Sequence, residues 1–276
     1  MIESLSSYNL ITGYIQLMKI TQIYTHNKLR NFVYLIELEN QQAIVIDPWD
    51  ATIIDQYLND RNLSLRAIIN THEHWDHTKG NEALVERHEC EVWAHQNGVG
   101  KVPGLTRTLN ANESIDIDLN SQLTVLDTPG HTLAHLCFVL KENGKATAVF
   151  TGDTLFNAGV GHCRSGGNEE ILYKTIREHF QNMDANILVY PGHDYLENNL
   201  KFTLQFEPNN KIAKQWLERV LDPDYSPGSI QTKIGDERNF NTFLRLDNKD
   251  IIDHLSLENP SPKHVFIALR GLRDKW

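Results

Sequence analysis

The sequence predicts a layered α/β fold followed by a C-terminal helical domain. As far as about residue 194, short β-branched or aromatic runs alternate with turn residues and with helical segments. Beyond His193 the apolar residues adopt helical spacing. Because the 276 residues exceed the roughly 100–200 residues of a typical domain, we expect two unequal domains, 18–194 and 195–276, after an N-terminal extension at 1–17.

The predicted strands are short apolar or alternating runs that end in turn residues. They are 19–26, 31–39, 42–48, 65–70, 90–95, 122–130, 135–140, 145–153 and 185–193. Helical spacing occurs between them at 50–60, 80–89 and 168–183, with Asp50 and Asn168 as predicted N-caps. The C-terminal domain is predicted to contain helices at 193–207, 210–222 and 261–276, the last one starting at Ser261 and Pro262.

Composition narrows the classes of function. The net charge is −10, with 40% hydrophobic and 22% charged residues and no basic stripe, which disfavours nucleic acid or an anionic membrane as a partner and favours a small molecule. Cys90, Cys137 and Cys163 form no CxxC pair, which favours a reducing compartment, the cytoplasm. The apolar patch within 1–17 follows no basic region and is shorter than the ~20 residues of a membrane span, so we expect no signal peptide there.

Four candidate metal ligands, His72, His74, Asp76 and His77, occur in the stretch THEHWDH, residues 71–77. Alternate residues of an extended chain project to one side, so His72 and His74 can converge on one ion. Asp76 and His77 form a second pair on the following turn, which lets one loop supply two neighbouring sites. A catalytic zinc usually takes three protein ligands and a water, so further ligands must come from elsewhere.

The ends of other predicted strands offer such ligands. His131, Asp153 and His193 each follow a glycine, which permits close approach of the backbone. One histidine for each ion and a bridging carboxylate would complete two sites. Imidazole and carboxylate without thiolate favour zinc, with iron or manganese allowed. Taken singly, a loop histidine is usually solvated and Asp153 would be a turn residue, but the combination with THEHWDH favours a metal centre.

Residues near these motifs are candidates for supporting roles. Asp47, at the end of the strand 42–48, either orients a ligand histidine or simply starts a turn. His135 is expected to support a ligand or to pack in the core. The remaining histidines are expected on the surface: His26, His88, His95, His179, His254 and His264.

In this order, THEHWDH and the glycine-preceded His131, Asp153 and His193 resemble the metallo-β-lactamase superfamily. Within it, THEHWDHTKGN, FTGDTLFNAG, YPGHDYLENNLKF and LRGLRDKW are similar to glyoxalase II, the hydroxyacylglutathione hydrolases. The similarity runs from about residue 18 to the end. It implies an αββα sandwich with two divalent metal ions at one edge and a helical domain that helps to bind glutathione.

The resemblance also implies roles for individual residues. Tyr195 matches a tyrosine that contacts glutathione, and Arg270 and Arg273 match basic positions in the last helix. Their spacing independently puts both arginines on one helix face, where they could bind a carboxylate or remain solvated. By the family pattern, His72, His74 and His131 would hold one ion, Asp76, His77 and His193 the other, and Asp153 would bridge them.

One segment departs from the family pattern. Where members commonly have a basic residue, an aromatic pair, Glu and Gly, residues 162–167 read HCRSGG. Either His162 or Arg164 takes over the binding of the glutathione peptide, or the substrate differs. Cys163 is expected to be an inert loop cysteine and not a reactive thiol.

The implied reaction is hydrolysis of S-D-lactoylglutathione, or a related S-acylglutathione, to glutathione and a carboxylic acid, with Asp76 and Asp153 as catalytic ligands. A water that bridges two divalent ions would be hydroxide at neutral pH and would attack the thioester carbonyl, and the thiolate would leave without a general acid. The alternative is a glutathione persulfide dioxygenase with a single iron. A lactamase leaves the helical domain unexplained, the acidic charge disfavours a nuclease, and the full ligand set disfavours a binding module with a dead site.

Overall fold

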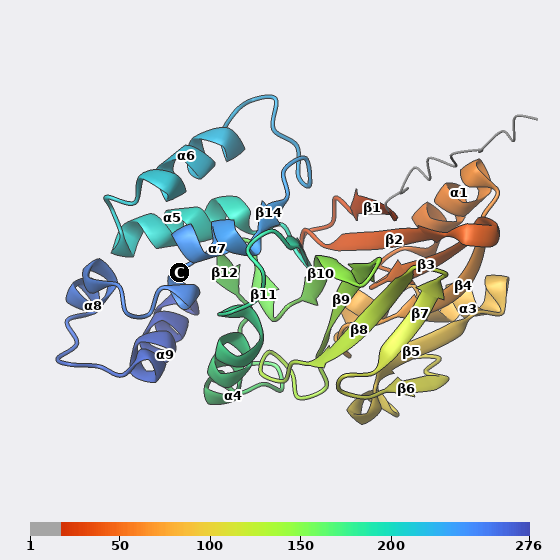
Figure 1. Ribbon diagram of the computed structural model, residues 1–276, viewed down its shortest axis with the longest axis horizontal. Coiled ribbons are helices and arrows are strands. Elements are labelled where there is room, and N and C mark those ends of the chain that lie inside the picture. Colours follow the sequence, from red (N-terminus) through yellow and green to blue (C-terminus); the bar gives the residue numbers. More distant parts are fainter. Residues whose placement is uncertain (1–17) are drawn as a thin grey trace, which may run out of the picture.

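Two six-stranded sheets pack face to face in the computed structural model, and helices cover their outer faces (Figure 1). This is the predicted αββα sandwich, and a helical region follows it along the chain. The structure describes residues 18–276, so the predicted extension at 1–17 lies outside the described residues. Among the described helices, none combines the length and the apolarity of a membrane span.

The first half of the chain forms one sheet and its covering helices. These elements are β1 Lys19–Tyr24, β2 Phe32–Leu38, η1 Glu39–Gln41, β3 Gln42–Ile46, α1 Ala51–Arg61, β4 Ser64–Ile69, α2 Trp75–Thr78, α3 Asn81–His88, β5 Glu91–His95, η2 Gln96–Gly98 and β6 Arg107–Leu109. The strands follow one another in chain order. The pairs β1–β2 and β2–β3 are antiparallel, whereas β3 to β6 run parallel because helical crossovers return the chain to the same end of the sheet.

The second sheet has the order β14-β13-β10-β9-β8-β7, and a separate hairpin joins β11 to β12. Only β10 and β13 pair in parallel, with α4 and a π-helical turn, η3, between them in the chain. The elements are β7 Ser114–Asp118, β8 Ser121–Asp127, β9 Leu136–Glu142, β10 Lys145–Gly152, β11 Leu155–Phe156, β12 Gly159–Val160, α4 Glu169–Thr175, η3 Ile176–Phe180, β13 Leu188–Pro191 and β14 Thr232–Lys233.

Alternation along the strands divides the core into layers. On β2, Phe32, Tyr34 and Ile36 face the second sheet, while Val33 and Leu35 face α1 and α3. The same division applies to the other strands, so one apolar layer fills the space between the sheets and another lies under the helices of the first sheet. Strands buried on both faces explain why several predicted strands are continuously apolar.

The predicted N-caps at Asp50, Asn168 and Ser261 are confirmed. The side chain of each accepts a hydrogen bond from a backbone N–H in the first turn of its helix. This satisfies donors that would otherwise have no partner at a helix start. Local sequence therefore fixes where α1, α4 and the last helix begin.

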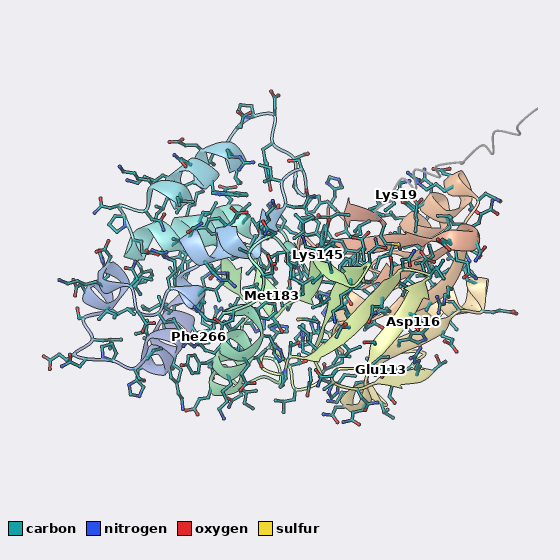
Figure 2. The ribbon with its side chains drawn as sticks, viewed as in Figure 1. Lys19, Glu113, Asp116, Lys145, Met183 and Phe266 are labelled. Carbon is teal, nitrogen blue, oxygen red and sulfur yellow. The ribbon has the colours of Figure 1, made fainter. Side chains whose placement is uncertain are left out.

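The helical region packs against the second sheet and its helix α4. It contains α5 Leu196–Phe206, α6 Lys211–Val220, α7 Ile234–Phe240, η4 Thr242–Leu244, α8 Lys249–Leu255 and α9 Pro262–Arg273. Phe266 on α9 packs against Tyr173 of α4, with 5.6 Å between ring centroids (Figure 2). The strand β14 comes from this region and pairs with β13, so residues after 194 complete the edge of the second sheet.

Sequence patterns missed some elements and misplaced one histidine. The strands β6, β7 and β14 and the helices α7 and α8 were not predicted, because each is short or carries charged residues on its exposed face. The expectation that His95 lies on the surface is wrong. His95 ends β5, is buried, and accepts a hydrogen bond from the backbone N–H of Asn97 through Nδ1.

Candidate metal centre

The structure brings the predicted ligands together at one edge of the sandwich, on the loops that follow strands. After β4 the chain bends at Thr71 and His72, and from His74 it enters α2, which carries Asp76 and His77. His131, Asp153 and His193 follow β8, β10 and β13 respectively. Because the strands are held by the sheet, these loops occupy fixed positions.

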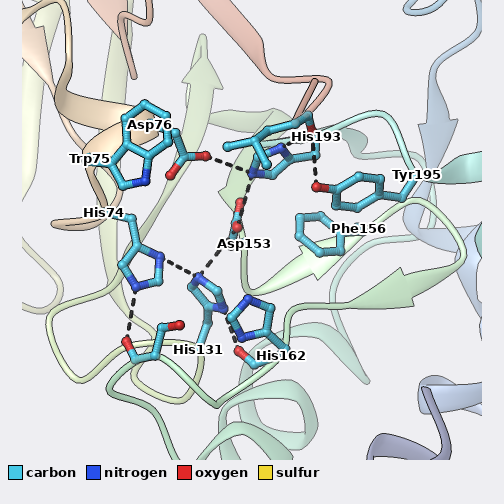
Figure 3. A pocket seen from close by; sticks show the side chains of 11 residues that line it. His74, Trp75, Asp76, His131, Asp153, Phe156, His162, His193 and Tyr195 are labelled. Carbon is cyan, nitrogen blue, oxygen red and sulfur yellow. Dashed lines mark hydrogen bonds and ion pairs between the residues drawn. The ribbon is translucent and has the colours of Figure 1, made fainter. Parts of the chain in front are cut away.

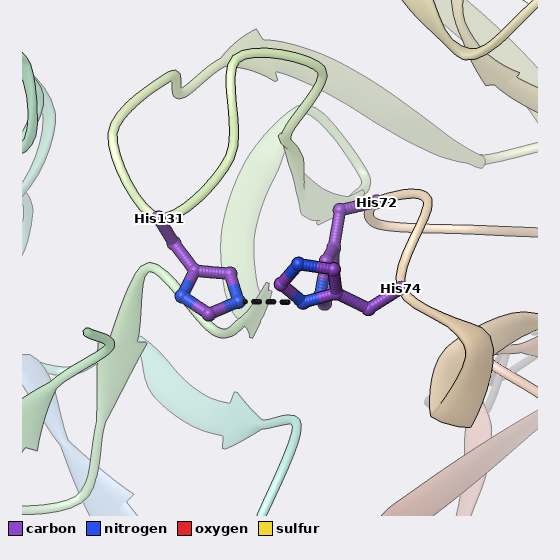
Figure 4. Close-up of side chains that lie close together, drawn as sticks. All are labelled: His72, His74 and His131. Atoms are coloured by element: carbon purple, nitrogen blue, oxygen red, sulfur yellow. Dashed lines mark hydrogen bonds between the residues drawn. The ribbon is translucent and has the colours of Figure 1, made fainter. Parts of the chain in front are cut away.

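His72, His74 and His131 form the first group (Figure 4). The Nδ1 atom of His74 lies 3.0 Å from Nε2 of His72 and 3.0 Å from Nε2 of His131. The other ring nitrogens of His74 and His131 donate to the carbonyl oxygens of Ser165 and His162, at 3.1 and 2.6 Å. In the neutral rings, the nitrogens that face each other therefore carry lone pairs, and a shared cation relieves their repulsion.

The second group consists of Asp76, His77 and His193. The Nε2 atoms of the two histidines are 3.2 Å apart, and Asp76 Oδ2 lies 3.4 and 3.5 Å from them. Here too the outer nitrogens are engaged, because His77 Nδ1 donates to Asp47 and His193 Nδ1 donates to the Leu29 carbonyl. This arrangement again brings imidazole nitrogens and a carboxylate oxygen together at one point.

Asp153 lies between the two groups. Its Oδ2 atom is 3.4 Å from His131 Nε2 and 3.2 Å from His193 Nε2, and its Oδ1 atom is 3.4 Å from His77 Nε2. Although Oδ1 is buried, it has no hydrogen-bond partner among the described residues. A buried carboxylate oxygen without a partner, between two sets of imidazole lone pairs, fits a pair of divalent cations.

The ionisation of several residues in the donor groups is strongly shifted. Burial alone would favour a neutral Asp153, but His193 and His77 hold the pKa of its carboxyl well below the usual range. Burial opposes a charge on His77, yet Asp153 and Asp47 raise its pKa to about 10. Burial lowers the pKa of His131 to about 3, which keeps this ring neutral and able to bind a metal.

Asp47 supports both groups at once. Its Oδ2 atom accepts from His77 Nδ1 at 2.8 Å and from the hydroxyl of Thr71 at 2.6 Å. The Thr71 hydroxyl in turn accepts from His72 Nδ1 at 3.0 Å. Asp47 thus contacts a predicted ligand histidine, His77, as expected. Its indirect link to His72 through Thr71 was not predicted. A carboxylate that accepts a hydrogen bond from the non-coordinating nitrogen of a ligand imidazole fixes the tautomer and the orientation of that ring.

His135 is buried beneath the first group. Its ring stacks on His72 with 4.9 Å between centroids, and its Nε2 accepts from the backbone N–H of Asp153 at 3.1 Å. A Cβ at Gly152, where φ is +46°, would lie 2.8 Å from the same Nε2. The glycine before Asp153 is therefore required, and His135 supports two predicted ligands, one of the two roles expected for it.

A cavity of about 340 Å³ opens onto the two groups (Figure 3). Tyr195 and His162 line it, as expected for residues that contact a substrate, together with several residues that sequence reasoning missed. Among the missed ones are Trp75 and Phe156. Neither the spacing nor the chemistry of these aromatic residues distinguishes them from core residues in the sequence.

The predicted basic residues lie around the cavity and not in its wall. Arg270 is only 3% exposed, and its guanidinium donates to the carbonyls of Val160 and Gly161. Arg273 donates to Asn199 Oδ1 at 3.0 Å, whereas Arg164 is largely exposed. Within residues 18–276, none of these three arginines is among the residues that line the cavity.

Comparison with known proteins agrees with this arrangement. Residues 27–193 match the family model of the metallo-beta-lactamase superfamily, and residues 194–276 match that of the hydroxyacylglutathione hydrolase C-terminus. A hydroxyacylglutathione hydrolase from Polaromonas sp. is 40% identical, over 94% of this chain and 100% of its own length. The chain belongs to the hydroxyacylglutathione hydrolase family. A further relative of that name, from Nitrosococcus oceani, is 41% identical with the same coverage.

A solved structure shares the fold of this member of the hydroxyacylglutathione hydrolase family. The crystal structure of ETHE1 from Myxococcus xanthus matches with a TM-score of 0.64 and 25% identity, covering 93% of this chain and 98% of its own. Membership of the superfamily implies that the protein binds a divalent metal, and the two groups of histidine and aspartate provide the donors.

The departure from the family pattern at 162–167 has a structural counterpart. The carbonyls of His162 and Ser165 accept the hydrogen bonds that orient His131 and His74, so the backbone of this loop supports the first group. Cys163 points into the core, and burial raises the pKa of its thiol to about 12. Burial and a raised pKa both disfavour the reactive thiolate, which agrees with the expectation of an inert cysteine.

Proposed function

We propose that the protein is a metal-dependent thioester hydrolase that converts S-D-lactoylglutathione, or a related S-acylglutathione, to glutathione and a carboxylic acid. The family membership supports this substrate class, since two relatives at 40% and 41% identity are hydroxyacylglutathione hydrolases. The observation that carries the proposal is the pair of donor groups with the unpartnered Oδ1 atom of Asp153 between them, at the base of a cavity.

In this proposal the donor groups hold two divalent ions, with zinc as the best match and iron or manganese as alternatives. When bound, such ions would supply Lewis acidity to polarise the thioester carbonyl and to lower the pKa of water, so that hydroxide would be available as the nucleophile. The proposed ligands are His72, His74 and His131 for one ion, Asp76, His77 and His193 for the other, and Asp153 for both.

The chain's own side chains would orient the reacting groups. Asn31 Nδ2 donates to Asp76 Oδ2 at 2.9 Å, which fixes the carboxylate that faces the cavity. Asp76 and Asp153 are the proposed catalytic aspartates because both carboxylates face the space where the carbonyl must lie. A thiolate has a low proton affinity as a leaving group, so no separate general acid is required.

Glutathione would bind on the side of the helical region. Tyr195 stacks on His193, with 5.1 Å between ring centroids, and its hydroxyl donates to the Leu29 carbonyl at 3.0 Å, so the ring is a fixed wall. Arg273 and Arg164 are the proposed partners of the glutathione carboxylates, with His162 as a further contact in the cavity. For Arg270 we propose an indirect role, holding Gly161 and thereby the loop that carries His162.

The alternative, a glutathione persulfide dioxygenase with a single iron, is less well supported. One ion would leave one buried donor group unused, and burying Asp76 and His77 without a cation would be unfavourable. The two activities are distinguished by oxygen consumption, which hydrolysis does not require.

Two further aspects are part of the proposal. Cys90, Cys137 and Cys163 are all free and buried, which supports a reducing compartment, and we propose the cytoplasm. The net charge of −10 supports a small-molecule substrate and not a nucleic acid.

The direct test is to assay the purified protein against S-D-lactoylglutathione under air and under nitrogen, with metal analysis of the same sample. We expect release of glutathione at equal rates in both atmospheres, and about two metal ions per chain. No release of glutathione from the thioester, together with oxygen consumption when glutathione persulfide is supplied and one iron per chain, would overturn the hydrolase in favour of the dioxygenase.

A further inference from the structure

Trp75 is a large aromatic side chain with an unusual position. It lies between His74 and Asp76 in the sequence, is 61% exposed, and lines the cavity above the donor groups (Figure 3). An exposed tryptophan leaves a large apolar area in water, so its presence at the mouth of a polar cavity calls for an occupant.

The ring of Trp75 is held in place. It packs against Trp49, with 5.2 Å between ring centroids, and the ammonium group of Lys79 lies 4.2 Å from the centroid of Trp49. The turn beneath is also fixed, because the N–H of Gly80 donates to the Pro48 carbonyl at 2.8 Å. Trp75 is therefore a prearranged apolar wall, which reduces the entropy lost when a ligand contacts it.

The opposite wall of the cavity has different chemistry. Tyr195 and Phe156 lie across the cavity from Trp75, with Asp153 between the two sides (Figure 3). Arg273 lies on the Tyr195 side, because it donates to Asn199, whose backbone N–H donates to the Tyr195 carbonyl. The cations nearer Trp75 are already engaged: Lys79 rests on Trp49, and Lys101 pairs with Glu73 at 3.6 Å.

An S-acylglutathione has its two carboxylates on the thiol side of the scissile bond and its acyl chain on the other side. If the carbonyl lies over Asp153 and the carboxylates turn toward Arg273, the acyl chain must extend toward Trp75. We propose that Trp75, supported by Trp49, forms an acyl subsite that selects substrates with apolar acyl chains. This inference rests on the proposed function and adds the substrate class within it.

The test compares S-acetyl-, S-butanoyl- and S-hexanoylglutathione as substrates of the native protein, Trp75→Phe and Trp75→Ala. A fully buried methylene is worth about fourfold in affinity, so partial burial predicts about a tenfold rise in kcat/KM from acetyl to hexanoyl in the native protein. The rise should be retained in Trp75→Phe and fall below about twofold in Trp75→Ala. Ratios between substrates cancel differences in metal occupancy between preparations.

The matched control is Leu119→Ala, which removes an apolar side chain that is 86% exposed in the turn between β7 and β8. It should keep the native dependence on chain length. Inhibition by glutathione gives a second measurement, since its inhibition constant should change less than about twofold in Trp75→Ala if Trp75 touches only the acyl part.

An unchanged chain-length dependence in Trp75→Ala, or a loss of glutathione affinity as large as the loss of acyl selectivity, would overturn the acyl subsite. Turnover of the three thioesters without any chain-length preference in the native protein would overturn the subsite and leave the hydrolase intact. No turnover of the three, with S-D-lactoylglutathione still hydrolysed, would overturn the subsite alone; no turnover of S-D-lactoylglutathione either would overturn both proposals.

Discussion

The strand-end loops and the helical region use charged side chains in opposite ways. Around Asp153, carboxylates and imidazole lone pairs face one another across a small space without protein partners for every atom. In the helical region, the buried carboxylate of Glu207 is paired, because Arg245 donates to both of its oxygens. The unpartnered Oδ1 atom of Asp153, surrounded by imidazole nitrogens, is where a bound cation would complete the structure, whereas the pair of Glu207 and Arg245 holds the helical region together.

The largest effect expected from this comparison is on catalysis. Replacing Asp76 by Ala removes a carboxylate from the second donor group, so kcat for S-D-lactoylglutathione should fall by at least about a thousandfold, on the scale of losing an essential electrostatic group. The circular dichroism spectrum should stay native, because Asp76 lies on a loop-end helix at the cavity and not in the core. Unchanged turnover would end the hydrolase account.

In the helical region, replacing a charged side chain by Ala should lower the stability of the protein and leave catalysis unchanged. Arg245→Ala leaves Glu207 buried without its bidentate partner, which should lower the free energy of unfolding by about 3 kcal/mol. Urea denaturation measures this. The control, Lys201→Ala, breaks the exposed pair with Glu197 and should cost less than about 1 kcal/mol. A large fall in kcat per folded Arg245→Ala molecule would contradict the division between the two regions.

The buried carboxyl of Glu237 should make the free energy of unfolding depend on pH. It is buried, accepts from the backbone N–H of Ala158 at 2.8 Å, and burial raises the pKa of its carboxyl to about 7 from 4.5. Between these values the folded state holds a proton that the unfolded state has lost, so this contribution to stability is complete below pH 4.5 and disappears as the pH rises through 7. Glu237→Gln cannot titrate. The unfolding free energy of the native protein relative to this variant should therefore fall by about 3 kcal/mol between pH 4.5 and 8; a constant difference would show that Glu237 does not retain its proton.

Asp47 sharpens the comparison because it directly follows β3 and contacts a proposed metal ligand, His77. Asp47→Asn removes the negative charge that holds His77 and, through Thr71, His72. Metal affinity measured by chelator competition should fall about 10- to 100-fold. Asp50→Asn, which preserves a good N-cap for α1, is the matched control and should not change it. Equal metal affinity in the two variants would show that Asp47 does not contribute to metal binding.

The smallest effect concerns the two arginines of α9. Arg273→Ala should raise KM about tenfold with little change in kcat, because a glutathione carboxylate would lose one charged contact. Arg270→Ala should instead reduce the melting temperature, since its guanidinium bonds to backbone carbonyls. If both variants changed KM and the melting temperature in the same way, the separate roles proposed for Arg270 and Arg273 would be wrong.

The sequence predicted the parts of the molecule that local rules determine. The helix starts at Asp50, Asn168 and Ser261 follow from capping chemistry, and the strand ends carry glycines where the backbone approaches closely. The donor residues are recognisable because four of them fall within one short stretch and the others follow apolar strands. Geometry then adds what the motif could not, namely that their lone pairs converge on two points.

Other features depend on contacts between distant segments. The strand β14 is too short to be recognised, and it becomes a strand only because β13 offers an unpaired edge. The spacing of Arg270 and Arg273 places them on one helix face. In the structure, Arg270 is buried and donates to the carbonyls of Val160 and Gly161, whereas Arg273 donates to Asn199 of α5. The position of Trp75 likewise depends on its packing against Trp49, and no local sequence pattern reveals that contact.

The measurement that tests the central claim most directly is anomalous diffraction from crystals grown with zinc. The account predicts two peaks per chain, one bounded by His72, His74 and His131 and the other by Asp76, His77 and His193, with Asp153 in contact with both ions. A single peak, or a second ion bound away from Asp153, would contradict the shared dinuclear centre and the hydrolysis proposed for it.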